Sequence, residues 1–327
     1  MLNIGGICVP LSLDYNLHCR YCFRDNHRLK DVPDFTPDMV EYLKSLTPKN
    51  CSIVTATGGE PLLHFDKVQQ LFSYVHKDIH KKIITNGTLL TGEMVDYINQ
   101  NNIELQLSHD GAITKYHRGV NVLDNTDKLN LICKVKNLTV TSVISKYNTD
   151  VWANFFYIAK KLNRTDFDYG SIILYKTPFT ADLVKDFDYD TWYNTWVQFQ
   201  CSKYKFKRKK IGQHRVFNFD VLPNGVFCAN LNICRNYGSI HSKSFSELRD
   251  KLIELGDMDY CINHKCKYID TCHFPPQDAS DHLCKCRKMI MDNAKPELIE
   301  KIRQYVAEHI SDIEKKYGYN RKDDSLC

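Results

Sequence analysis

Two cysteines near the N-terminus, Cys19 and Cys22, have the spacing that most directly indicates chemistry. They lie in the segment Leu13 to Arg24, LDYNLHCRYCFR, which follows a β-rich stretch and which we expect to be a loop after a strand. A Cys-x-x-Cys pair in such a loop is a redox pair, half of a metal site, or a chance spacing. The pair alone does not choose among these interpretations.

Three further motifs each follow an expected strand. They are Gly58-Gly59-Glu60-Pro61, Thr85-Asn86-Gly87 and Ser108-His109-Asp110-Gly111. The carboxyl ends of parallel strands meet at one edge of a sheet, so we expect all four motifs to share one site. The succession resembles the radical S-adenosylmethionine (radical SAM) superfamily over roughly the first 175 residues. That family's Cys-x-x-x-Cys-x-aromatic-Cys loop appears here as YNLHCRYC, with Tyr15 in the first cysteine position.

The resemblance implies two cofactors, a [4Fe–4S] cluster and S-adenosyl-L-methionine (SAM). In the family, three thiolates hold the cluster, and the open iron binds the amino and carboxylate groups of SAM. An electron passed to the sulfonium produces a 5′-deoxyadenosyl radical, which abstracts hydrogen from a substrate. Soft thiolates suit iron–sulfur clusters, so Cys19 and Cys22 are the expected ligands.

The ligand role of Tyr15 has several possible interpretations. A phenolate can ligate iron, but its pKa near 10 makes it a poorer ligand than a thiolate at neutral pH. Alternatively, the tyrosine leaves a labile cluster, or another thiol such as Cys8 reaches the iron. Cys8 lies about 23 Å upstream in an extended strand, which disfavours that option. We expect an impaired or unusually ligated site, and a natural lineage without the activity is a further alternative.

The resemblance also implies a set of residues around SAM. Gly58 and Gly59 would let backbone carbonyls approach its amino group, and Glu60 would supply the countercharge. Asn-Gly and Asp-Gly pairs are also common turns, and an arginine often lies at the surface, so each of these residues has a structural alternative. The remaining expected contacts are Asn86, Ser108 and Asp110 at the ribose and carboxylate, Arg118 as a bidentate carboxylate partner, and Tyr21 and Ile144 at the adenine.

Seven cysteines lie close together in the C-terminal part of the chain. They resemble the SPASM or shorter twitch extension, in which a hairpin cysteine and a later cysteine cluster hold one or two auxiliary [4Fe–4S] clusters. The family's Cys-x-x-Cys-x5-Cys-x3-Cys run is only partly present, and Pro276 stands at its fourth position. A structural four-thiolate zinc site is the alternative. The expected ligands are Cys228, Cys234, Cys261, Cys266, Cys272, Cys284 and Cys286, and the nearby Asp278 is a candidate proton acceptor.

The segments between the motifs alternate between strand and helix patterns. Such alternation with short joints predicts parallel strands and right-handed crossovers. We therefore expect an α/β protein: a partial (β/α)6 TIM-like barrel with a small cysteine-rich C-terminal domain and a closing helix. The expected strands are 7–13, 51–56, 82–85, 104–107, 138–144 and 171–175, and the expected helices are 37–46, 68–75, 92–99, 128–134 and 151–162.

Four segments make up the expected domain organisation. The barrel covers 1–180, and a linker over 181–214 contains the basic run KYKFKRKK, which is either solvated or a cradle for an anion. An iron–sulfur domain over 215–295 begins with a hairpin that turns at Pro-Asn-Gly. The last segment, 296–327, contains an amphipathic helix.

Composition limits the classes of protein. The 327 residues are 43% hydrophobic and 25% charged, as in a globular domain. No apolar window is long enough for a membrane span, and no secretory signal is present, so we expect a cytoplasmic protein. Fourteen cysteines in that setting indicate reduced thiols and metal ligation. A net charge of +5 does not by itself imply a nucleic-acid partner.

The expected function is hydrogen abstraction that modifies a peptide or protein side chain. The chain begins almost at the first strand, which calls for a separate recognition protein if the substrate is a peptide. An electron donor such as flavodoxin or ferredoxin is the other expected partner. The alternatives are a small-molecule or nucleotide substrate, or a degenerate iron–sulfur scaffold without catalysis, for which Tyr15 is the main argument.

Overall fold

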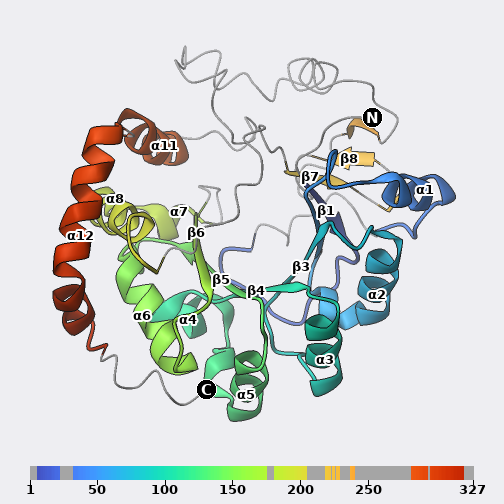
Figure 1. The fold of residues 1–327 in the computed structure, drawn as a ribbon, viewed down its shortest axis with the longest axis horizontal. Helices are drawn as coiled ribbons and strands as arrows, with labels where there is room; N and C mark the ends of the chain where they lie inside the picture. Colours follow the sequence, from blue (N-terminus) through green and yellow to red (C-terminus); the bar gives the residue numbers. More distant parts are fainter. Residues whose placement is uncertain are drawn as a thin grey trace.

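One curved sheet with helices along its outer side organises the chain (Figure 1). The computed structural model describes residues 6–22, 32–174, 180–204, 218–221, 223–224, 226–228, 236–239, 281–293 and 295–319. Within these residues the sheet has nine strands in the order β6-β5-β4-β3-β2-β1-β7-β8-β9. The strands are β1 (Gly6–Pro10), β2 (Ile53–Thr57), β3 (His80–Thr85), β4 (Glu104–Ser108), β5 (Leu138–Ile144), β6 (Asp168–Ile173), β7 (Asn218–Val221), β8 (Val226–Cys228) and β9 (Asn236–Ser239).

The first six strands are parallel neighbours in sequence order, as the alternation predicts. None of the described helices combines the length and apolar character needed to cross a bilayer. The α-helices are α1 (Pro37–Ser45), α2 (Phe65–Tyr74), α3 (Gly92–Gln100), α4 (Thr114–Arg118), α5 (Thr126–Cys133), α6 (Val151–Leu162), α7 (Ala181–Val184), α8 (Tyr189–Gln200), α11 (Asp281–Asn293) and α12 (Pro296–Lys316). Among the described residues, the short 3₁₀ segments are η2 (Pro61–His64), η3 (Gly111–Ile113) and η4 (Val122–Asp124).

Local sequence sets where these helices begin. Thr36 accepts a hydrogen bond from the Met39 amide at 3.3 Å, and Pro37 occupies the first position of α1, as expected for an N-cap. Asp150 caps α6 in the same way, through the Ala153 amide at 3.0 Å. These caps satisfy amides that would otherwise lack partners at a helix start.

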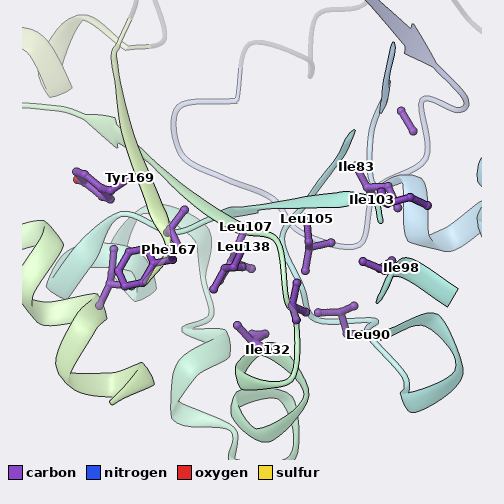
Figure 2. Packing of buried hydrophobic residues seen from close by; sticks show 14 of the residues in the cluster. Ile83, Leu90, Ile98, Ile103, Leu105, Leu107, Ile132, Leu138, Phe167 and Tyr169 are labelled. Atoms are coloured by element: carbon purple, nitrogen blue, oxygen red, sulfur yellow. The ribbon is translucent and has the colours of Figure 1, made fainter. Parts of the chain in front are cut away.

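The outer face of the sheet is apolar and packs on the helices. Alternate residues of each strand point to this side, among them Leu105 and Leu107 of β4 and Leu138 of β5, and all three are buried. Figure 2 shows these side chains meeting Ile98 and Ile132 from the covering helices. A shift of one residue in the pairing of a strand would turn these side chains to the opposite face of the sheet. The apolar pattern therefore fixes the register and the place where each strand ends.

The opposite, concave face is polar. On this face Glu104, the first residue of β4, contacts Lys82 at 2.8 Å, His80 at 2.6 Å and Thr139 at 2.7 Å. Burial by itself raises the pKa of the Glu104 carboxyl, but the hydrogen bond from His80 and the charge of Lys82 lower it to about 2. The interior of the open barrel is therefore lined by paired polar groups beneath the strand ends.

Several described elements differ from the sequence expectation, and the first strand ends at Pro10 rather than at residue 13. The last barrel strand is Asp168–Ile173 rather than 171–175, because the aromatic alternation begins at Phe167 and Tyr169, whose rings lie 5.4 and 5.8 Å from Phe155 of α6. Residues 281–293 form a helix that the sequence did not indicate.

The expected hairpin is present as β7 and β8, but β7 also pairs with β1 in parallel and so extends the barrel sheet. Its first residue is Asn218. The proposed boundary at 215 remains a prediction, and most of the basic run lies outside the described residues. The closing helix α12 follows the expected range and contacts α8 (Figure 1).

Candidate active site

The two thiols lie on one tight turn at the carboxyl end of β1. The amide of Cys22 donates to the carbonyl of Cys19 at 2.9 Å, and both cysteines are partly buried. The Arg20 amide donates to the carbonyl of His117 at 2.8 Å, which attaches the turn to α4. The sequence motif therefore becomes a turn fixed to a neighbouring strand-end helix.

Asp110, just after β4, is the centre of the polar contacts beneath this turn. It is fully buried, and Tyr21, which is 8% exposed, donates its hydroxyl to Oδ2 at 2.8 Å. Arg118 donates Nε to Oδ2 at 2.8 Å and Nη2 to Oδ1 at 3.1 Å. His117 lies 3.3 Å from Oδ2, and the Val143 amide donates to Oδ1 at 2.7 Å. The predicted residues Tyr21, Asp110 and Arg118 thus lie together, and their polar groups hydrogen-bond to one another.

The interactions within this cluster keep Asp110 negatively charged and Arg118 positively charged. Burial by itself raises the pKa of Asp110, but the attraction of Arg118 and the hydrogen bond from His117 hold it well below its usual range. Burial by itself lowers the pKa of Arg118, yet Asp110, followed by Tyr21 and Cys19, raises it above its usual value. Burial also raises the pKa of Tyr21 well above its usual value, so Tyr21 stays a neutral donor.

The glycine motif after β2 lies directly against the loop that leads to the cysteines. The Gly59 amide donates to the Ser12 carbonyl at 2.8 Å, and the Glu60 amide donates to the Asp14 carbonyl at 2.7 Å. A Cβ at Gly59 would lie 1.9 Å from the Asp14 carbonyl oxygen, and one at Gly58, where φ is +136°, would lie 2.4 Å from that of Ser12. The protein backbone itself therefore requires both glycines.

Replacing Gly59 with alanine is expected to lower the free energy of unfolding by about 3 kcal/mol, because the added carbon overlaps a backbone oxygen that cannot move alone. The matched control is Gly92→Ala at the start of α3, where nothing lies within 4 Å of the new carbon. That variant should be neutral or slightly stabilising. Thermal melting of the iron-free protein measures both, and equal melting temperatures would contradict the close approach.

Glu60 is directed into the protein. Its carboxylate accepts from the Thr85 hydroxyl at 2.7 Å, the Asn86 amide at 2.9 Å and the Leu62 amide at 3.1 Å. These bonds hold the ends of β2 and β3 together. The expected role of Glu60 as countercharge to an amino group remains a prediction, and the observed partners of the carboxylate are internal.

Asn86 connects the third strand end to the cysteine loop. Its Nδ2 donates to Asn16 Oδ1 at 3.0 Å, and Asn16 donates in turn to the Thr88 hydroxyl at 2.9 Å. Ser108 ends β4 and is partly exposed beside this edge. The four motifs therefore share one edge of the sheet, as their order predicts.

Ile144 and its neighbour Val143 face opposite sides of β5. Ile144 is completely buried in the main core beneath the helices, whereas Val143 packs against a separate small cluster that contains Tyr21 and Leu174 and that Cys19 also contacts. The structure thus places Val143, rather than the predicted Ile144, on the side of the thiols. The two-residue period of a strand was the signal that could have distinguished them. His117 was also missed, because nothing in the sequence indicated the short helix α4.

His109, next to Asp110, is a buried neutral histidine. The Gly111 amide donates to Nδ1 at 3.2 Å, so the ring proton is assigned to Nε2, which donates to Asn121 Oδ1 at 2.8 Å. Burial lowers the pKa of His109 to about 4. This side chain fixes the loop after β4 without carrying charge at neutral pH.

Acidification should destabilise the protein through His109. Its pKa is about 4 when folded and 6.5 when exposed, so between these values the unfolded chain binds the extra proton. Stability is therefore full above pH 6.5 and falls by about 3 kcal/mol as the pH drops to about 4. The His109→Gln variant should show a shallower fall in melting temperature over this range, whereas replacing the exposed His76 should not; identical profiles would refute the assignment.

Only part of the expected auxiliary site lies within the described residues. Cys234, Cys261, Cys266, Cys272 and Asp278 lie outside them, and of Cys228 only the strand backbone in β8 is described. Cys284 and Cys286 lie two residues apart on α11 and so leave the helix on different sides. Cys286 is completely buried in the main core. Ligation by these cysteines remains a prediction.

The donor chemistry of the first site fits an iron–sulfur cluster at two of its three positions. Cys19 and Cys22 are soft donors on one turn, while Tyr15, partly buried and in edge contact with His18 at 5.8 Å, offers a phenol. Among the described residues, no group of three histidine, cysteine or carboxylate side chains is arranged to hold a metal ion. A third protein ligand to iron would be either Tyr15 or a residue other than these three.

An open parallel barrel with a thiol turn and a glycine turn at its strand ends defines a protein of the radical SAM type. Residues 16–162, somewhat less than half of the chain, match the profile of the Radical SAM superfamily. This match, together with the open parallel sheet, confirms the expected fold class and supports SAM and a [4Fe–4S] cluster as the cofactors.

Curated relatives match parts of the chain. An uncharacterised protein, MJ0907, of Methanocaldococcus jannaschii is 29% identical over 169 residues, which cover 47% of this chain and 58% of that protein. The radical SAM cyclopropyl synthase TigE of Paramaledivibacter caminithermalis is 26% identical over 191 residues, covering 51% and 37%. A cysteine-type anaerobic sulfatase-maturating enzyme of Clostridium perfringens is 29% identical over 117 residues, 31% of each chain. The matched stretch is therefore less than two thirds of each relative.

Solved structures share the fold over more of the chain. The structure described as native anSMEcpe with bound AdoMet and Kp18Cys peptide has a TM-score of 0.60 and 18% identity, covering 91% of this chain and 99% of that chain. Streptococcus suis SuiB bound to the precursor peptide SuiA has a TM-score of 0.51 and 14% identity, covering 74% and 63%. At these identities the likeness concerns the fold.

Proposed function

We propose that this chain is a radical SAM enzyme that abstracts hydrogen from a side chain of a peptide or protein. The observation that carries the proposal is the Cys19–Cys22 turn, fixed beside the glycine loop at the strand ends of an open parallel barrel. When bound, a [4Fe–4S] cluster with an open iron supplies the electron that cleaves SAM reductively. Cys19 and Cys22 would hold that cluster.

The protein's own residues supply the surroundings of this reaction. The amides and carbonyls between Gly59 and the Ser12–Asp14 loop fix one side of the opening, and Asn86 bonded to Asn16 fixes another. On the thiol side, Val143 packs against the same small apolar cluster as Cys19, and Asp110 is fully buried. A reactive intermediate needs surroundings that are fixed in advance, and these contacts supply them.

A peptide or protein substrate is supported by two kinds of observation. Two solved neighbours of the same fold were captured with peptides, Kp18Cys and SuiA. At the rim of the site, Arg20 stacks over Tyr116 at 4.1 Å, and Tyr116 meets Tyr147 at 5.3 Å. The two tyrosines are 42% and 50% exposed, and tyrosine and arginine are enriched in protein interfaces. A substrate chain, a separate recognition protein, or an electron donor such as flavodoxin or ferredoxin could dock there.

The test is anaerobic reconstitution of the full chain with iron and sulfide, followed by assay for 5′-deoxyadenosine with a chemical reductant. We expect the wild-type chain to bind iron and sulfide and to form 5′-deoxyadenosine. The Cys19→Ser, Cys22→Ser double variant should form no product and should retain only iron that is held elsewhere in the chain. Bound iron without product would favour the second candidate, a non-catalytic scaffold, for which Tyr15 in a ligand position is the specific observation. Zinc alone, with no product, would refute both.

A further inference from the structure

We propose that Asp110 is a positioning residue for the cysteine turn: through Tyr21 it fixes the orientation of Cys19 and Cys22 before iron binds. This role is one step removed from the direct contact with SAM that the motif predicts for Asp110. The relevance of this role to catalysis rests on the proposed function, but the anchoring of the cysteine turn by Asp110 does not.

Asp110 has no acceptor capacity left for a cofactor. Two carboxylate oxygens offer about four lone-pair positions. Tyr21 and Arg118 donate to Oδ2, Arg118 and the Val143 amide donate to Oδ1, and His117 lies within 3.3 Å of Oδ2. The carboxylate is fully buried, so SAM hydroxyl or amino groups would have to displace one of these internal donors.

Tyr21 transmits this anchoring to the thiols because it lies between them in the chain. Its hydroxyl bonds to Asp110, its ring meets the ring of His117 edge-on at 5.1 Å, and the Arg118 guanidinium lies 5.3 Å from its ring centre. The side chain of Tyr21, directly before Cys22, thus contacts three groups of the segment 110–118 that follows β4. A buried bond to a charged acceptor is among the stronger hydrogen bonds in proteins.

A second attachment makes the turn a fixed unit. The Arg20 amide bonds to the His117 carbonyl, and His117 Nε2 lies 3.1 Å from the Ser145 hydroxyl. Two consecutive residues of the turn, Arg20 and Tyr21, are therefore tied to the segment that follows β4. That segment is itself tied to β5 through the Val143 amide. Three strand ends together determine where the thiols point.

This anchoring matters more here than in a loop with three cysteines. With Tyr15 in the first position, only two residues of this loop, Cys19 and Cys22, offer thiolates, so bound iron would have less power to order the loop. The contacts of Tyr21 and Arg20 must then supply the missing order.

The decisive comparison is Tyr21→Phe against Tyr169→Phe. Tyr169 is also buried and donates its hydroxyl to that of Ser142 at 2.9 Å, a neutral acceptor in place of the charged Asp110. In the iron-free full chain, hydrogen exchange of the Arg20 and Cys22 amides should be about tenfold faster in Tyr21→Phe than in wild type, and unchanged in Tyr169→Phe. This measurement needs no metal, so it decides the anchoring even if the proposed function fails.

The reconstituted proteins test the consequence for iron. In Tyr21→Phe, iron should be released to a chelator about tenfold faster, and the electron paramagnetic resonance signal of the reduced protein should change. Tyr169→Phe should match wild type in both. Unchanged exchange in Tyr21→Phe would overturn the anchoring. Faster exchange with a wild-type spectrum and wild-type iron release would overturn the positioning role and leave Tyr21 as a stabilising side chain alone.

Discussion

Replacing Asp110 with alanine is expected to lower the free energy of unfolding by about 3–5 kcal/mol, the cost of leaving a buried charge without its partner. Arg118, with 9% of its side chain exposed, would lose the carboxylate that binds both Nε and Nη2. The Tyr21 hydroxyl would lose its acceptor as well. Thermal and denaturant unfolding of the iron-free full chain measure the effect.

The matched control is Asp124→Ala. Asp124 also pairs with a cation, Lys161 at 2.7 Å, but half of its side chain is exposed, so its loss should cost less than about 1 kcal/mol. In the double variant Asp110→Ala, Arg118→Leu, a large part of the stability should return, because no buried ion is left unpaired. Equal effects of the two single variants, or no recovery in the double variant, would contradict the observed pairing.

Replacing Tyr15 with cysteine is expected to raise the iron retained at the first site several-fold, toward the full complement of a [4Fe–4S] cluster. A cysteine thiol ionises near pH 8.5 and a phenol near pH 10, and thiolate is the softer donor, so a third cysteine would complete the usual ligand set. The measurements are iron and sulfide per chain and the optical and magnetic spectra after anaerobic reconstitution. The yield of 5′-deoxyadenosine should rise with the iron.

The control for this variant is Tyr15→Phe. If the phenolate ligates iron, the phenylalanine variant should lose iron relative to wild type; if it does not, the two should retain the same amount. The ring contact with His18 is preserved in shape, so the comparison isolates the hydroxyl. Unchanged iron and spectra in Tyr15→Cys would mean that position 15 does not face the site and that the motif alignment is wrong.

The cysteine pair shows how much of the site the sequence could predict. Its spacing, and the order of the glycine, Asn86 and Asp110 motifs after successive strands, placed all four at one sheet edge, and the structure confirms this placement. The placement was predictable because parallel strands ending at one edge follow from alternating strand and helix patterns, and those patterns are local. Helix starts at Thr36 and Asp150 are local for the same reason.

The orientation of the site side chains was decided by the tertiary structure alone. Tyr21 and Asp110 are 89 positions apart, and Glu60 meets Thr85 and Asn86 from a different strand end. A carboxylate in a motif can face a ligand or an internal arginine, and only the packing of distant segments determines which. Likewise, parallel pairing of β7 with β1 depends on a contact across more than 200 residues, which no local pattern encodes.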